Sequence, residues 1–338
     1  MRSEASSDVF KVWLYAAASV LLGTWFSPLL YNAGKALAEV SSAKQTNGAL
    51  EWLAGLCRAA DFTDFFVSSL TISALLLFLP LIHWLRGGRS ADREKVWALR
   101  LPEGARSMTG GQPLLKNRAG LRQMITGFLL VTVLFLLIAG MLILAGILEW
   151  KAPEGNLAKI AARGFAMALG LALFQEILFR GIAMGIFLRA MRPAAALGLS
   201  TVLFALVHFL SPPPAVHVLD PDAAGVGFEL LKKIATQFSD ISVVLGIFTP
   251  LLALGGILAY ARWRTASLCL PIGIHCGWIF VNAILGSITV AASRPHSVMW
   301  VLAGTSLRQG LVRLVGILLA GVLTNYLTNT DDATDTPP

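Results

Sequence analysis

The chain carries, in the middle of an apolar stretch at residues 160–190, the hexapeptide Gln175-Glu176-Ile177-Leu178-Phe179-Arg180. The stretch is long enough to cross a bilayer as a helix, since a span needs about 20 mostly apolar residues. A carboxylate and a guanidinium are costly inside hydrocarbon, so ionisable residues in such a place usually mark a functional site. The hexapeptide therefore predicts a membrane-spanning helix with a polar site inside it.

The composition favours a polytopic membrane protein. Of the 338 residues, 56% are hydrophobic and 14% are charged, whereas soluble domains contain about 25% charged residues. The mean hydropathy is +0.71. The pattern predicts an all-α fold, a polytopic membrane helix bundle with about eight transmembrane helices. The spans are expected near residues 10–30, 64–85, 122–149, 160–190, 194–211, 241–261, 265–290 and 308–327.

The charges outside these spans predict the topology. Lys and Arg are frequent in the loop between the second and third predicted spans and in the connections near residues 190 and 263. Basic loops remain on the cytoplasmic side, so we expect both termini in the cytoplasm. The net charge of +8 then reflects topology, and no nucleic-acid partner is expected. Residues 1–338 should form a single membrane domain, with a disordered acidic tail at residues 328–338.

Two later spans each carry a histidine. His208 closes the fifth predicted span, four residues after Phe204, and His275 lies in the seventh. Glu176 and Arg180 are four residues apart, in the order that favours an ion pair on one helix. Such a pair could orient its helix without doing any chemistry. Beside the two histidines, it predicts a buried polar site contributed by three helices.

The order of these motifs resembles that of the CAAX protease and bacteriocin-processing (CPBP) family of intramembrane endopeptidases, which includes the Ras-converting enzyme of eukaryotes. The family pattern is Glu-Glu-x-x-x-Arg, then Phe-x-x-x-His, then His-x-x-x-Asn. The resemblance covers residues 160–290. It implies that this segment is the catalytic core of the chain.

The resemblance also implies roles for individual residues. Glu176, His208 and His275 are expected to be catalytic, with His208 holding the attacking water and His275 polarising the scissile carbonyl. Arg180 and Phe204 are expected to be binding residues. Arg180 would either orient Glu176 or hold a carboxyl group of the substrate.

Two positions depart from the family pattern. Gln175 stands where the family has its first glutamate, which is the proposed general base. An amide does not take up a proton in the physiological pH range. The asparagine of the third motif falls at Ile279, and Asn282 lies one turn further on. We count Gln175 and Asn282 among the candidate catalytic residues because they occupy or replace these positions.

The resemblance predicts an intramembrane endopeptidase that hydrolyses CAAX-type or related peptides with a water activated by a carboxylate and a histidine. The alternative is a weak or inactive relative that acts as a membrane scaffold or chaperone. A transporter is disfavoured because the sequence has no internal repeat. The expected partners are membrane lipid and a peptide or membrane-protein substrate. The expected location is the bacterial inner (plasma) membrane.

A metal-dependent mechanism is also open. Glu176, His208 and His275 supply one carboxylate and two imidazoles, an acceptable ligand set for a catalytic zinc ion. The sequence contains no His-Glu-x-x-His motif. The sequence therefore leaves open whether the mechanism uses a divalent metal or a glutamate.

Overall fold

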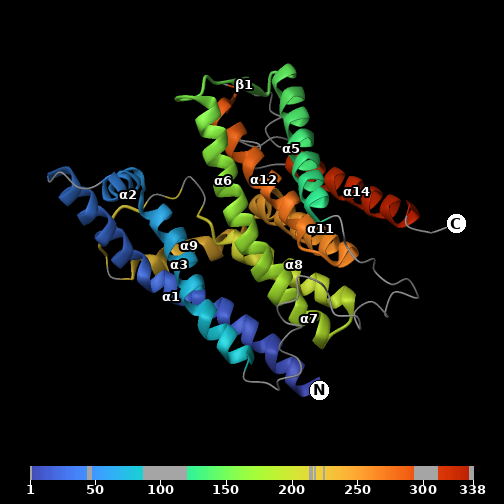
Figure 1. The fold of residues 1–338 in the computed structure, drawn as a ribbon. Coiled ribbons are helices and arrows are strands. Elements are labelled where there is room, and N and C mark those ends of the chain that lie inside the picture. Colours follow the sequence, from blue (N-terminus) through green and yellow to red (C-terminus); the bar gives the residue numbers. More distant parts are fainter. Residues whose placement is uncertain are drawn as a thin grey trace. The chain divides into compact units, whose positions relative to one another are not determined.

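The computed structural model describes residues 2–43, 48–86, 120–212, 216, 218–223, 225–292 and 311–334. They are almost entirely helical, which confirms the predicted all-α membrane bundle (Figure 1). Among the described residues, six helical segments are long and apolar enough to cross a membrane. These are Ser7–Ala43, Phe62–Leu85, Gly120–Leu144, Leu157–Ala190, Ile241–Thr265 and Cys269–Ile288.

The other two predicted spans correspond to shorter apolar helices, Pro193–Phe209 and Val312–Thr328. The first, with 17 residues, is shorter than the roughly 20 residues that a full crossing needs, whereas the second is the apolar part of the longer helix Leu311–Thr334. The first is limited by proline at both ends, because Pro193 is its first residue and Pro212 follows soon after its last. Proline suits the first turn of a helix and cannot continue one. Within the described residues, the eight predicted spans thus correspond to six helices long and apolar enough to cross a membrane and to two further apolar helices.

The chain divides into two compact units. The first unit contains most of the predicted core. Its elements are α5 (Gly120–Leu144), β1 (Leu148–Trp150), α6 (Leu157–Glu176), the π-helix η4 (Ile177–Ala183), α7 (Met184–Ala190), α8 (Pro193–Phe209) as far as Leu206, α10 (Ile241–Val243), the π-helix η6 (Val244–Phe248), α11 (Thr249–Thr265), α12 (Cys269–Ile288), β2 (Thr289–Ala291) and α14 (Leu311–Thr334).

The second unit consists of the N-terminal helices and one later helix. Its elements are α1 (Arg2–Ala43) from Ser6 onward, α2 (Gly48–Ala59), α3 (Phe62–Arg86), the last residues of α8, α9 (Val226–Thr236) and the 3-10 turn η5 (Gln237–Ser239). Lys35 of α1 donates hydrogen bonds to the carbonyls of Cys57, Arg58 and Ala60, at 3.1, 3.3 and 2.7 Å. A cation at these carbonyls complements the negative end of the α2 dipole.

A short antiparallel ribbon replaces the ends of two predicted spans. Gly146 has a φ of 69°, and Ile147 N–H bonds to Leu142 O while Gly146 N–H bonds to Ile143 O. This left-handed glycine cap ends α5. Strand β1 then pairs with β2. The helices thus end before residues 149 and 290, where the sequence had placed the span ends.

Close helix packing positions α12 within the first unit. A Cβ atom on Gly273 would collide with the carbonyl oxygen of Met124, and one on Gly277 would lie 2.7 Å from that of Phe128. Glycines one turn apart therefore let the backbones of α12 and α5 touch. Residue 275 is rotated about 200° from residue 273 around the helix. This turns the His275 side chain away from α5, while α6 lies on another side of α12 (Figure 1).

The connection from α11 to α12 sets where α12 begins. Ala266 has a φ of 52° and breaks the helix. Ser267 Oγ then accepts a hydrogen bond from Cys269 N–H, and Thr265 Oγ1 donates one to the carbonyl of Ser267. Pro271 cannot donate to that carbonyl and lies in the first turn of α12, where proline is tolerated. The predicted span 265–290 thus starts at Cys269, past the break.

The predicted acidic tail and the basic connections lie partly within the described residues. Helix α14 continues through Thr334, so it extends into the predicted tail of residues 328–338. Residues 335–338 lie outside the described residues, as does most of the basic loop before α5. Arg262 and Arg264 lie in the last turn of α11, where cations interact favourably with the helix dipole.

Candidate active site

Glu176 and Arg180 form a fully buried ion pair. Arg180 Nη1 donates to Glu176 Oε1 at 3.0 Å, and neither side chain is exposed to solvent. Glu176 is the last residue of α6, and Arg180 lies in η4. The predicted pairing of these two residues is therefore present. The contact is compatible with the role of orienting Glu176, and the choice between this role and that of holding a substrate carboxyl group stays a prediction.

The turn that carries Arg180 is a π-helix, from Ile177 to Ala183. A π-turn contains an extra residue relative to an α-turn and occurs often at functional sites. At its end, Met184 N–H bonds to Phe179 O, five residues back. The side-chain directions after Glu176 are thereby shifted from those of an unbroken α-helix. This shift accompanies the burial of Arg180 inside the unit.

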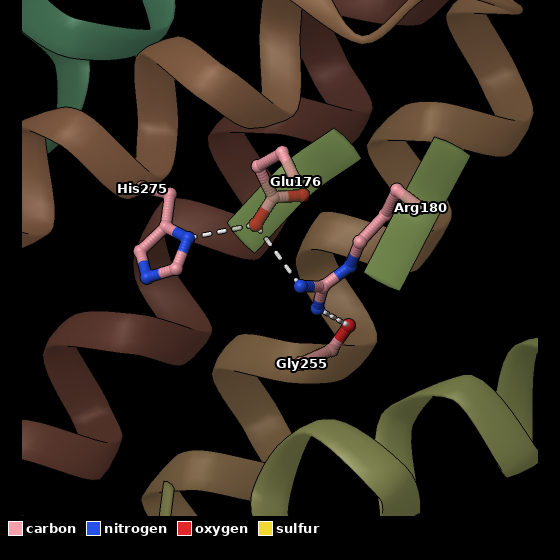
Figure 2. Close-up of polar contacts among 4 residues, drawn as sticks. All are labelled: Glu176, Arg180, Gly255 and His275. Carbon is pink, nitrogen blue, oxygen red and sulfur yellow. Dashed lines mark hydrogen bonds and ion pairs between the residues drawn. The ribbon is translucent and has the colours of Figure 1, made fainter. Parts of the chain in front are cut away.

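His275 contacts the same carboxylate oxygen as Arg180. Its Nδ1 lies 2.7 Å from Glu176 Oε1, and its side chain is 2% exposed (Figure 2). When Nδ1 carries the proton and donates to the carboxylate, Nε2 keeps its lone pair. A carboxylate that holds one ring nitrogen of a histidine fixes both the tautomer and the orientation of the ring. Glu176 thus joins η4 and α12 through a single oxygen atom.

The guanidinium of Arg180 also contacts α11 and α8 of the first unit. Its Nη2 donates to the carbonyl oxygen of Gly255 on α11 at 3.0 Å (Figure 2). Its Cζ lies 4.2 Å from the centre of the Phe204 ring on α8. The same ring meets His275 edge to face, with a centroid separation of 5.5 Å. Residues from α6, η4, α8, α11 and α12 therefore converge on this cluster.

Two buried polar atoms of the cluster have no hydrogen-bond partner among the described residues. These are Glu176 Oε2 and Arg180 Nε. A buried polar group without a partner costs about 1–3 kcal/mol, and more if it is charged. Each such group calls for an explanation, and a catalytic role is one of those possible. The two atoms are therefore compatible with a functional site.

Gln175 and Asn282, two further predicted site residues, make none of the contacts described above for the cluster. Gln175 is half-buried on α6 beside Glu176. Asn282 Nδ2 donates to the carbonyl of Trp278 in its own helix at 2.7 Å, and Ile279 packs against the small residues Ala168 and Ala172. The catalytic role of Asn282 stays a prediction, and in this structure its side chain bonds to its own helix.

His208 lies in the last turn of α8, one turn after Phe204, and is half-buried. It belongs to the second unit, whereas Glu176 and His275 belong to the first. Its role beside these two residues accordingly stays a prediction from the sequence.

Within the first unit, the cluster supplies two of the three predicted zinc ligands, Glu176 and His275, so the zinc site stays a prediction. Among the described residues, no group of three His, Cys, Asp or Glu side chains could hold a metal. Glu176 Oε1 already receives Arg180 and His275 Nδ1. A guanidinium in contact with the carboxylate would repel a cation placed on it. We therefore derive no step through a metal ion.

Residues 157–281 match the family model described as type II CAAX prenyl endopeptidase, Rce1-like. This segment is an Rce1-like domain. The Rce1-like domain begins with α6 and ends within α12, so it contains Glu176, Arg180, Phe204 and His275. It ends one residue before Asn282. No curated protein and no solved structure matches the chain.

Sequence reasoning missed two features of the Rce1-like domain. One is the carbonyl of Gly255, which holds Arg180 from α11, a helix that carried no predicted site residue. Its only signal was the pair Gly255-Gly256 inside an apolar span, where glycine often allows close helix approach. The other is the π-turn at Arg180. No residue pattern in the hexapeptide distinguishes a π-turn from an α-turn.

Proposed function

We propose that the chain is an intramembrane endopeptidase that hydrolyses a peptide bond of a CAAX-type or related membrane-associated substrate. The match to a type II CAAX prenyl endopeptidase model supports this class of reaction. The observation that carries the mechanism is the 2.7 Å contact between Glu176 Oε1 and His275 Nδ1. A carboxylate and an imidazole in this arrangement are suited to activating a water molecule.

In the proposed reaction, His275 acts as the general base and not, as the resemblance implied, as the group that polarises the carbonyl. Glu176 holds His275 with Nδ1 protonated, and Nε2 takes a proton from the attacking water. The water oxygen forms a bond to the scissile carbonyl carbon, and the carbonyl oxygen takes the negative charge. The imidazolium then gives its proton to the amide nitrogen as the C–N bond breaks. The products are a carboxylic acid and an amine. Glu176 stabilises the imidazolium while it lasts.

The other residues have supporting roles in this proposal. Arg180 neutralises part of the charge on Glu176. The carboxylate then stabilises an imidazolium at His275 less strongly, so we expect a slow enzyme. His208 would help to position the water, as its place in the Phe204-x-x-x-His208 motif suggests. Gln175 would hydrogen-bond to water or substrate without exchanging a proton.

The proposal includes a location. We place both termini in the cytoplasm and the chain in a bacterial inner membrane, with lipid and a peptide or membrane-protein substrate as partners. The six apolar helices support integration into a membrane. The side of each terminus rests on the basic connections alone.

A scaffold or chaperone is the second candidate function. Gln175 favours it, because an amide stands where the family pattern has its base. The bond from Asn282 to Trp278 points the same way, since it directs the side-chain amide toward the helix backbone. A scaffold of this kind would bind the substrate segment and release it uncleaved.

Gln175→Glu separates these candidates. We expect the wild-type protein in proteoliposomes to cleave a quenched, prenylated C-terminal peptide slowly. A second carboxylate should raise kcat by about 10²-fold, within the usual contribution of general-base catalysis. Gln175→Leu is the matched control and should not raise the rate. If the peptide binds to wild type and to Gln175→Glu but neither protein cleaves it, the protein is a scaffold.

A further inference from the structure

We propose that Phe204 and Gly255 are positioning residues, which set the contact between Glu176 and His275 by holding the guanidinium of Arg180. The sequence pattern assigned Phe204 to binding and gave Gly255 no role. The consequence for catalysis rests on the proposed function. The consequence for the geometry of the cluster does not.

Phe204 cannot serve as a contact surface for substrate in this structure, because its side chain is 0% exposed. Its ring instead touches both partners of Glu176. The face of the ring lies 4.2 Å from Cζ of Arg180, and the ring meets His275 at an interplanar angle of 69°. The face of an aromatic ring attracts a cation, and its edge is weakly positive. One side chain thus contacts both the guanidinium of Arg180 and the imidazole of His275.

Gly255 fixes the second end of the guanidinium. Nη1 of Arg180 donates to Glu176, and Nη2 donates to Gly255 O, both at 3.0 Å. The guanidinium is a rigid planar fork, so a partner at Nη2 also determines the direction in which Nη1 points. The carbonyl of Gly255 therefore helps to set where Glu176 Oε1 lies, and through that oxygen the orientation of His275.

The position requires glycine because α11 and α8 approach closely there. A Cβ atom on residue 255 would lie 3.0 Å from Cδ1 of Phe204 and 3.3 Å from the carbonyl oxygen of Thr201. The neighbouring Gly256 differs, since its nearest contacts would be Thr201 side-chain atoms at 3.9 and 4.0 Å. A methyl group at residue 255 must displace the Phe204 ring or the carbonyl, whereas one at residue 256 fits.

The test uses histidine-labelled protein in detergent and follows the Nδ1–H resonance of His275 by NMR, assigned by its loss in His275→Gln. Wild type should show a proton shifted downfield by its bond to the carboxylate. Gly255→Ala and Phe204→Leu should move this resonance upfield or broaden it. Gly256→Ala and Phe187→Leu are the matched controls, and they should leave it unchanged. Phe187 is as fully buried as Phe204 but lies on α7.

A variant that keeps the size of the ring covers the case in which Phe204→Leu does not fold. Site-specific 3,5-difluorophenylalanine at position 204 weakens the negative ring face that attracts the guanidinium. We expect the His275 resonance to move in the same direction as in Gly255→Ala, by a smaller amount. An unchanged resonance in the folded difluoro variant and in Gly255→Ala would overturn the proposal.

Kinetics extend the test to catalysis. Gly255→Ala should lower kcat for the quenched peptide by up to about 10²-fold with KM unchanged, since small misplacements of a reacting group have effects of that size. Gly256→Ala should match wild type. If wild type cleaves no peptide but the resonance responds, the proposed function fails and the positioning role stands. If wild type cleaves and the resonance does not respond, the positioning role fails.

Discussion

Glu176→Gln is expected to abolish peptide cleavage and to lower the free energy of unfolding by about 3–5 kcal/mol, because breaking a buried ion pair leaves the other charge uncompensated. Arg180 is 0% exposed, and within the described residues its ion-pair partner is Glu176. The neutral amide also loses the negative charge that holds His275 Nδ1. The midpoint of thermal unfolding in detergent measures the first effect.

A double-mutant cycle gives this prediction a control. Arg180→Met has a side chain of similar length and no charge, so Glu176→Gln/Arg180→Met contains neither member of the pair. Because neighbouring sites couple, the double variant should be more stable than the sum of the two single losses predicts. Fully additive losses would mean that the 3.0 Å contact contributes no coupling energy, contrary to our account of the pair.

Gly273→Ala should prevent the first unit from folding or lower its stability by about 3 kcal/mol or more, at the upper end of overpacking effects. The new methyl group would collide with the backbone carbonyl of Met124, and a backbone atom cannot rotate away as a side chain can. The yield of monodisperse protein after extraction measures the outcome, together with the thermal midpoint.

Gly140→Ala is the matched control on the opposite helix. Gly140 lies inside α5, and a Cβ atom there would meet nothing within 4 Å. Alanine has a higher helix propensity than glycine, so this variant should be as stable as wild type or slightly more so. If Gly273→Ala behaves like Gly140→Ala, then α12 and α5 do not pack backbone to backbone.

The sequence allowed the Glu176–Arg180 pair to be predicted because that contact depends on local helix spacing alone. The contact of His275 with the same carboxylate joins residues 99 positions apart. The common motif order made it a reasonable hypothesis, but only the packing of α12 against its neighbours determines it. Gly255 was not predictable for the same reason, since its contribution is a backbone carbonyl that every residue possesses.

Another difference from the sequence pattern concerns which glycines lie at close helix contacts. Gly181 and Gly185 are four residues apart, a spacing that can allow close helix approach, yet a Cβ on Gly181 would meet only ordinary contacts and one on Gly185 none within 4 Å. The close approach occurs instead at Gly273 and Gly277, which flank His275. Small residues permit such contacts but do not choose which helix makes them.

The span lengths differ from prediction because hydropathy does not register helix breaks. The left-handed Ala266 between α11 and α12, and the glycine cap at Gly146 after α5, interrupt runs that remain apolar in the sequence. The first break separates two helices that carry site residues, and the second ends α5, which packs against α12. The break at Ala266 determines where α12 begins, and therefore where His275 lies along that helix.

The rate of peptide cleavage by His275→Ala, measured beside wild type in the same proteoliposomes, tests the central claim most directly. The claim is that Glu176 holds His275 as the group that takes the proton from water. We predict a fall in kcat of about 10²–10⁴-fold, the usual contribution of a general base, in a protein that still folds. A folded His275→Ala variant that cleaves the peptide as fast as wild type would contradict it.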